Sequence, residues 1–144
     1  MNKPTYNPQS AFRNSQSITV LGGGPAGLYC ALLLKKADPA LSIAVFERNP
    51  PDVTYGWGVV FSDRTLSSFQ RADYKTYTEI TEQFVIWDAI DVRYRGETIS
   101  CGGHVIAAIE RRRLLNILQK RCAELGVDLH FGRSIAHFKP TICV

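Results

Sequence analysis

The sequence has few of the features that mark a specialised class of protein. Its four cysteines stand far apart and form no C-x-x-C pair, which argues against a zinc site and against a disulfide framework. No stretch approaches the roughly 18 apolar residues of a membrane-spanning helix, and no internal repeat is evident. We therefore expect a cytoplasmic protein without a metal, whose thiols are reduced and mostly buried; they are Cys30, Cys101, Cys122 and Cys143.

The charge of the chain is also modest. Its net charge is +4, from 17 Lys and Arg against 13 Asp and Glu, and the basic residues are scattered apart from residues 111–113. Because no basic run is interleaved with aromatic residues, we expect no nucleic-acid partner; the small excess suits a dinucleotide or an acyl-CoA. The 144 residues, 45% of them hydrophobic, allow one ordinary domain with a packed core. Residues 1–16 predict a flexible leader, and residues 17–144 form the domain.

A glycine-rich turn near the N-terminus is the most informative stretch. Residues 18–21 are apolar and partly β-branched, as in a buried strand, and the apolar residues after the turn recur at helical spacing. In such a strand–turn–helix unit the first glycine permits a sharp turn, the second lets a diphosphate approach, and the third lets helix and strand pack closely. The free amides at the start of the helix then face the diphosphate. The candidate binding residues of this turn are Gly22, Gly24, Pro25, Ala26 and Gly27.

An acidic residue follows the next predicted strand, which covers residues 41–46. Glu47 lies twenty residues after Gly27, where a carboxylate can accept hydrogen bonds from both ribose hydroxyls of an adenosine. It also disfavours a 2′-phosphate, so NADP is not the expected occupant. The alternative is that Glu47 is only a polar residue at a strand end.

The middle of the chain predicts a loop, two helices and a hairpin. Residues 48–63 contain two prolines and a tryptophan between glycines, Gly56-Trp57-Gly58, so we expect a loop in which Trp57 either anchors packing or contacts a ligand. Two short helices over residues 66–83 are expected as a lid on the sheet. The predicted strands are residues 84–87, 90–94, 98–101 and 105–109, with turns at 95–97 and 102–104.

The last helix predicted from the sequence begins with three arginines. Its apolar face, which includes Leu114 and Leu118, is followed by a stop at Gly126 and by a strand over residues 127–131. Cations oppose the dipole at a helix N-terminus, so this end requires an anion, either Glu110 or a bound phosphate. None of the three histidines has ligand-like spacing or a partner for catalysis, so we assign no general base.

Taken together, these motifs resemble the N-terminal part of the FAD-dependent aromatic-ring hydroxylases, the single-component flavin monooxygenases. The likeness is greatest to the group acting on aryl-CoA thioesters such as salicylyl-CoA and 2-aminobenzoyl-CoA (anthraniloyl-CoA). It extends from about residue 18 to 131 and is carried by residues 22–28, 47–49, 55–63, 87–92, 102–104 and 111–118.

The resemblance implies an α/β fold: a Rossmann-like, glutathione-reductase-like FAD-binding domain, here incomplete, with inserted helices and a β-hairpin. It implies FAD as cofactor, NAD(P)H as reducing co-substrate, O₂, and a small aromatic or aryl-CoA substrate. In it, Gly22, Gly24 and Gly27 hold the FAD diphosphate, Glu47 the adenosine ribose, Arg111 the diphosphate or ribose, and Arg48 lies near the adenine.

The sequence stops before the motifs that bind NAD(P)H and the ribityl chain in this family, so we expect a truncated domain with uncovered strand edges. Two other interpretations stay open. One is an NAD-linked dehydrogenase or another oxidoreductase with the same fingerprint. The other is a non-catalytic module that binds adenine nucleotides weakly, or only a partner chain.

Overall fold

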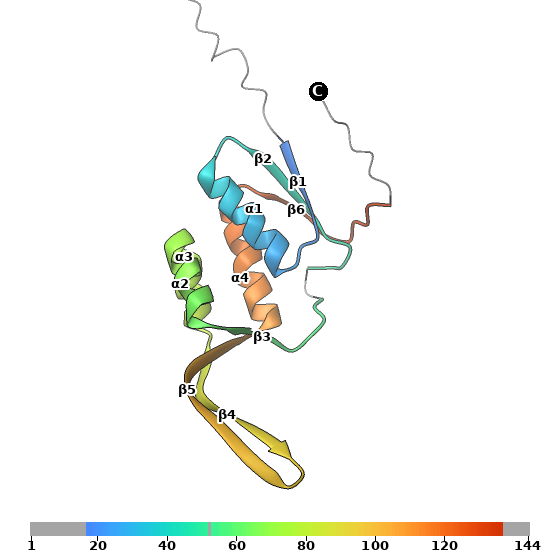
Figure 1. Cartoon of the computed structure of the whole chain (residues 1–144). Helices are drawn as coiled ribbons and strands as arrows, with labels where there is room; N and C mark the ends of the chain where they lie inside the picture. The colour runs from blue at the N-terminus through green and yellow to red at the C-terminus, as the bar shows by residue number, and fades with distance from the viewer. Residues whose placement is uncertain (1–16, 52, 137–144) are drawn as a thin grey trace, which may run out of the picture.

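The computed structural model describes residues 17–51 and 53–136, and Figure 1 shows their arrangement. The elements in chain order are β1 (Ser17–Leu21), α1 (Pro25–Ala37), β2 (Ser42–Phe46), β3 (Gly58–Phe61), α2 (Asp63–Ala72), α3 (Tyr74–Thr81), β4 (Val85–Tyr94), β5 (Glu97–Glu110), α4 (Arg111–Glu124) and β6 (Asp128–His130).

A parallel three-stranded sheet in the order β1-β2-β6 forms the first layer. Ile43 and Val45 of β2 are buried where α1 and α4 pack side by side on one face of this sheet. Their apolar side chains meet those of Leu28, Leu32 and Leu118, which are fully buried in the same cluster. The predicted α/β class, with a parallel sheet and a glycine turn between β1 and α1, is confirmed.

The helices α2 and α3 form an outer layer rather than a lid on the sheet. Phe69 of α2 stacks on Tyr29 of α1, with ring centroids 4.2 Å apart. Asp73, which separates α2 from α3, is 3% exposed and binds Lys36 of α1 at 2.6 Å and Arg121 of α4 at 2.9 Å. The expected lid was therefore wrong, because aromatic stacking and a buried carboxylate direct these helices to α1 and α4.

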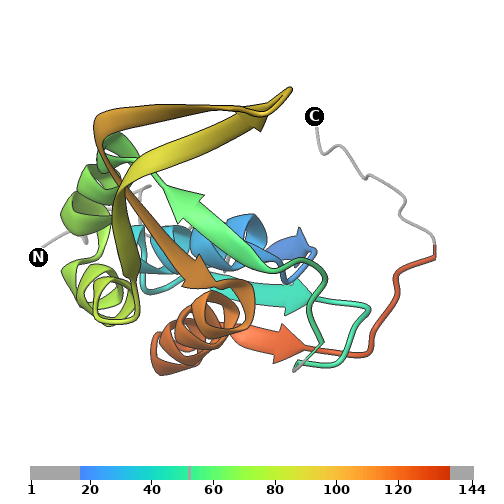
Figure 2. The same cartoon turned by 90° about the horizontal axis from the view of Figure 1, so that it is seen from below.

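The second sheet, in the order β3-β5-β4, carries a long hairpin away from the helices (Figure 2). The predicted loop over residues 48–63 contains β3, which pairs with the end of β5. The strands predicted at 84–87 and 90–94 are one strand, β4, with an irregularity between Trp87 and Ala89. The turn predicted at 102–104 lies inside β5: Gly103 adopts a φ of 93° there without ending the strand.

The cysteines only partly follow the prediction. Cys122 is buried, its thiol donates to the carbonyl oxygen of Leu28 at 3.2 Å, and burial raises its pKa to about 11. Cys30 and Cys101 are exposed, so the expectation of mostly buried thiols was wrong. Cys143 and His137 lie outside the described residues. In the part of the chain described here, every helix is too short or too polar to cross a bilayer.

Candidate dinucleotide-binding site

The turn between β1 and α1 depends on two glycines for its backbone shape. Gly22 has a φ of 104°, which side chains other than glycine rarely adopt, and its N–H donates to the Phe46 carbonyl at 2.8 Å. A Cβ on Gly27 would lie 2.0 Å from the Gly22 carbonyl oxygen, an impossible contact. The fold itself therefore requires Gly22 and Gly27, because together they bring the start of α1 against the end of β1.

Gly24 is different, because nothing in the protein requires its small size. Its φ is −73°, an ordinary value, and a Cβ there would meet nothing within 4 Å. It is the N-cap of α1, and Pro25, which has no N–H, follows it at the start of the helix. Within residues 17–51 and 53–136, the amides of Gly24, Ala26 and Gly27 have no hydrogen-bond acceptor. Open space and free donors therefore lie together at the positive end of this helix, as an anion site requires.

Glu47 follows β2 and is held against the glycine turn. Its Oε2 accepts the N–H of Gly23 at 2.8 Å, while its Oε1 accepts both the backbone N–H and the side-chain amide of Asn49 at 2.8 Å. The Asn49 backbone hydrogen bond, followed by that of Gly23, lowers the pKa of Glu47 against the opposing effect of burial. The carboxylate is thus ionised at neutral pH and fixed beside the turn.

A hollow joins the turn, Glu47 and the start of α4. Its lining residues are Gly23, Gly24, Glu47, Asn49, Pro50, Pro51, Val53, Thr54, Tyr55, Arg111, Leu115, Gln119 and Phe131. The lining comes from the glycine turn, the loop between β2 and β3, helix α4 and Phe131, and its two charged residues are Glu47 and Arg111. Backbone donors, a cation and a carboxylate in one hollow match the diphosphate and ribose of an adenine dinucleotide.

Arg111 is the cation of this hollow, and it differs from the two arginines that follow it in its ion pairing. Arg112 and Arg113 both contact Glu110, at 3.9 and 3.3 Å. Arg111 has no carboxylate partner among the residues that the structure describes, although it occupies the first position of α4, where the dipole disfavours a cation. An anion bound in the hollow would supply the opposite charge that this arginine lacks.

Arg48 is not brought into the same hollow. It is exposed and lines a second hollow together with Gly22 and Glu47, so Glu47 borders both hollows. The structure therefore gathers Gly22, Gly24, Pro25, Ala26, Gly27 and Glu47 around one turn, brings Arg111 to the first hollow, and leaves Arg48 in the second hollow, which Gly22 and Glu47 also line.

The sequence analysis did not predict two polar residues that also line this hollow, Asn49 and Gln119. Asn49 fixes the carboxylate of Glu47, and Gln119 reaches across from α4 to the Pro51 carbonyl at 3.5 Å. Asn49 had a usable signal, since an amide two residues after an acid at a strand end commonly forms a local hydrogen bond. Gln119 had no such signal in the sequence, because only the packing of α4 brings it near the loop between β2 and β3.

A glycine turn between a parallel strand and a helix, with an acid at the end of the next strand, is typical of α/β folds that bind dinucleotides, and the comparisons with known proteins extend this likeness. A family model described as "Lycopene cyclase protein" matches residues 17–139. Salicyloyl-CoA 5-hydroxylase of Streptomyces sp is 43% identical over 114 residues, covering 79% of this chain and 22% of that protein. The 3-hydroxy-4-methyl-anthranilyl-[aryl-carrier protein] 5-monooxygenase of Streptosporangium sibiricum is 34% identical over 115 residues, covering 80% and 33%.

A solved structure extends the likeness to the fold. The oxygenase acting on 2-methyl-3-hydroxypyridine-5-carboxylic acid superposes with a TM-score of 0.69 at 19% identity, over 83% of this chain and 32% of that chain. The protein belongs to the family that the matching model describes, and it is similar over most of its length to part of a hydroxylase and part of a monooxygenase. The chain spans only about a fifth to a third of the length of these relatives.

Proposed function

We propose that this chain binds the adenosine diphosphate half of FAD. The observation that carries the proposal is the hollow that Gly24, the ionised Glu47 and Arg111 line together, at the helix start where the amides of Gly24, Ala26 and Gly27 have no acceptor among the described residues. The amides and Arg111 hold the two phosphates, and Glu47 accepts hydrogen bonds from the ribose hydroxyls. A 2′-phosphate next to Glu47 suffers charge repulsion, which disfavours NADP.

As part of a whole enzyme, this site serves the hydroxylation of an aromatic ring. Bound flavin supplies the chemistry by passing electrons from NAD(P)H to O₂ and delivering one oxygen atom to the ring. The residues of this chain hold the cofactor and orient it against the substrate. The names of both curated relatives refer to an aryl group carried on CoA or on a carrier protein, so an aryl thioester such as salicylyl-CoA or 2-aminobenzoyl-CoA is the substrate class we favour.

A competition experiment with fragments of the cofactor tests the proposal. The chain is titrated with FAD by isothermal calorimetry, alone and in the presence of excess ADP or FMN. Because the glycine turn, Glu47 and Arg111 hold the adenosine diphosphate side, ADP should displace FAD and FMN should not. Binding of FMN in place of ADP, or of neither FAD nor ADP, contradicts the proposal. NADH-dependent oxygen consumption then separates a working hydroxylase from a module that binds the cofactor without turnover.

Gly24→Val is the sharpest variant for this site. The protein leaves open space at Gly24 and its φ suits any residue, so the valine variant should fold with a loss of about 1 kcal/mol as a poorer N-cap. Its side chain nevertheless fills the approach to the free amides, so FAD and ADP binding should be lost. Gly102→Val in the hairpin is the matched control, since a Cβ there meets only ordinary contacts at 3.6 Å or more.

A further inference from the structure

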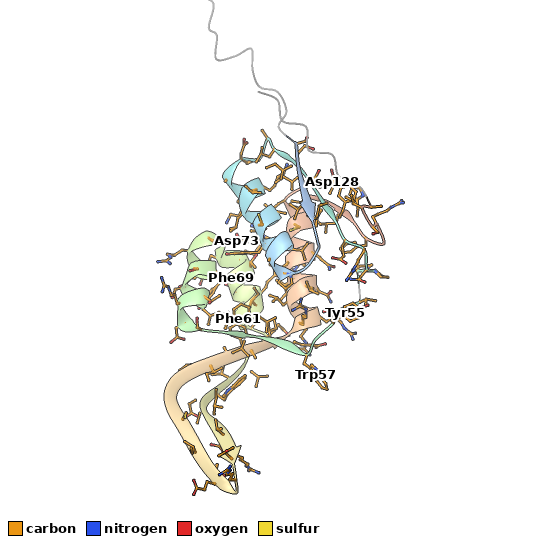
Figure 3. All side chains as sticks on the ribbon, turned by 45° about the vertical axis from the view of Figure 1, so that its right-hand side comes forward. Tyr55, Trp57, Phe61, Phe69, Asp73 and Asp128 are labelled. Carbon is orange, nitrogen blue, oxygen red and sulfur yellow. The ribbon has the colours of Figure 1, made fainter. Side chains whose placement is uncertain are left out.

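Among the described residues, Trp57 has the most exposed large hydrophobic side chain, while its backbone is held by hydrogen bonds and strand pairing. Its indole is 97% exposed. Figure 3 shows it projecting below the start of α4, at the end of the molecule from which the hairpin extends. The carbonyl of Trp57 accepts the N–H of Arg111 at 3.3 Å. On one side Gly56 adopts a φ of 98°, and on the other Gly58 begins the pairing of β3 with β5.

The two flanking glycines serve the backbone and not the indole. The positive φ of Gly56 turns the chain past Arg111, whose Cδ lies 3.7 Å from the position of a Cβ on Gly56. At Gly58 a Cβ would lie 3.1 Å from the Ile109 carbonyl oxygen, so the strand lies close against β5. The loop therefore presents the indole at a defined place while giving it almost no contact with the protein.

The position of Trp57 relative to the hollow suggests what it meets. Tyr55 lines the hollow, whereas Trp57 does not; it adjoins the hollow through its hydrogen bond to Arg111. In a dinucleotide bound as proposed above, the ribose lies at Glu47 and the phosphates lie between the glycine turn and Arg111. Because Arg111 lines the hollow and donates its N–H to the Trp57 carbonyl, a ligand that extends past Arg111 beyond its second phosphate comes close to Trp57.

We infer that Trp57 is a positioning residue that stacks on the second ring system of the bound dinucleotide, which in FAD is the isoalloxazine. This inference rests on the proposed function. A planar, electron-poor ring is a good partner for an indole, and stacking of an aromatic side chain on a heteroaromatic base contributes about 1–3 kcal/mol. The stacked ring also covers the apolar surface that Trp57 exposes.

The ratio of FAD affinity to ADP affinity tests the inference, because ADP contains everything up to the second phosphate and lacks the second ring. Trp57→Ala should weaken FAD binding about 10-fold and change ADP binding by less than about 2-fold. Trp57→Phe should recover most of the FAD affinity, since a phenyl ring also stacks. Trp87→Phe, in the hairpin, removes the other tryptophan of the chain and should leave both affinities unchanged.

Flavin emission gives a second readout that a merely structural role of Trp57 would not move. An indole in contact with a flavin quenches its fluorescence, so at saturation bound FAD should emit more strongly in Trp57→Ala than in the unaltered chain or in Trp87→Phe. An unchanged FAD-to-ADP ratio, or equal losses for both ligands, overturns the inference while leaving the adenosine site intact. Failure of the unaltered chain to bind either ligand overturns the proposed function, and this inference falls with it.

Discussion

Two parts of the molecule are stabilised by different interactions: the body, which consists of the parallel sheet and the four helices, and the hairpin of β4 and β5. In the body, the parallel sheet and the helices α1 and α4 share one cluster of fully buried side chains. In the hairpin of β4 and β5, apolar side chains such as Ile90, Val92 and Ile99 are exposed, and the paired backbone supplies the order. The whole candidate site lies on the body, so the sequence places its binding residues where burial fixes the backbone.

Truncating one buried leucine should damage the body far more than any truncation in the hairpin. Leu118 is fully buried between α1 and α4, so Leu118→Ala should lower the free energy of unfolding by about 3 kcal/mol through lost burial and the cavity that remains. Ile99→Ala is the matched change in the hairpin and should cost less than about 1 kcal/mol. Urea unfolding followed by circular dichroism measures both. Equal losses would mean that the hairpin has a buried partner in solution.

The ionic centre at Asp73 should give the body a distinctive dependence on pH. Burial acts to raise the pKa of Asp73, but the hydrogen bonds from Arg121, Lys36 and Thr76 outweigh it and hold the pKa well below its usual value of 3.8. The ionised form is thus favoured by folding, so this stabilisation is complete above about pH 4 and is lost as the pH falls further.

Replacement by asparagine removes that dependence. Asp73→Asn should lower the free energy of unfolding by about 2–3 kcal/mol at pH 7, because Arg121 and Lys36 lose their shared carboxylate. Its stability should then fall less steeply between pH 4 and 2 than that of the unaltered chain. If the free energy of unfolding varied with pH in the same way in Asp73→Asn and in the unaltered chain, Asp73 would contribute little to holding α2 and α3 against α1 and α4.

The arginines that open α4 offer a comparison within a single turn. Arg111→Gln removes the cation of the hollow and should weaken ADP binding about 10-fold, with a smaller dependence on salt concentration. Arg113→Gln is the control, since Arg113 contacts Glu110 and Gln83 on the exposed side and should leave binding unchanged. Titrations at two salt concentrations measure both effects. Similar losses in the two variants would mean that only the general charge of the helix matters.

Local patterns predicted the elements that carry the site. The strand, the glycine turn and the acid at the next strand end are each visible within a few residues, and the structure brings Gly24, Glu47 and Arg111 to one hollow. Features that depend on distant pairing were not visible. Strand β3 exists because β5 supplies its partner, and Asp73 draws α2 and α3 to the other helices. Arg48 sits beside Glu47 in sequence and shares the second hollow with it, but it does not line the hollow that holds Gly24 and Arg111.

The most direct test of the account is a two-dimensional NMR titration of the isotope-labelled chain with ADP. Binding of the diphosphate at this turn predicts large shifts at the amides of Gly23, Gly24, Ala26 and Gly27, smaller shifts near Arg111, and none in the outer hairpin, residues 89–102. An unmoved glycine turn, or changes concentrated in the hairpin, would contradict the claim that this turn holds the diphosphate.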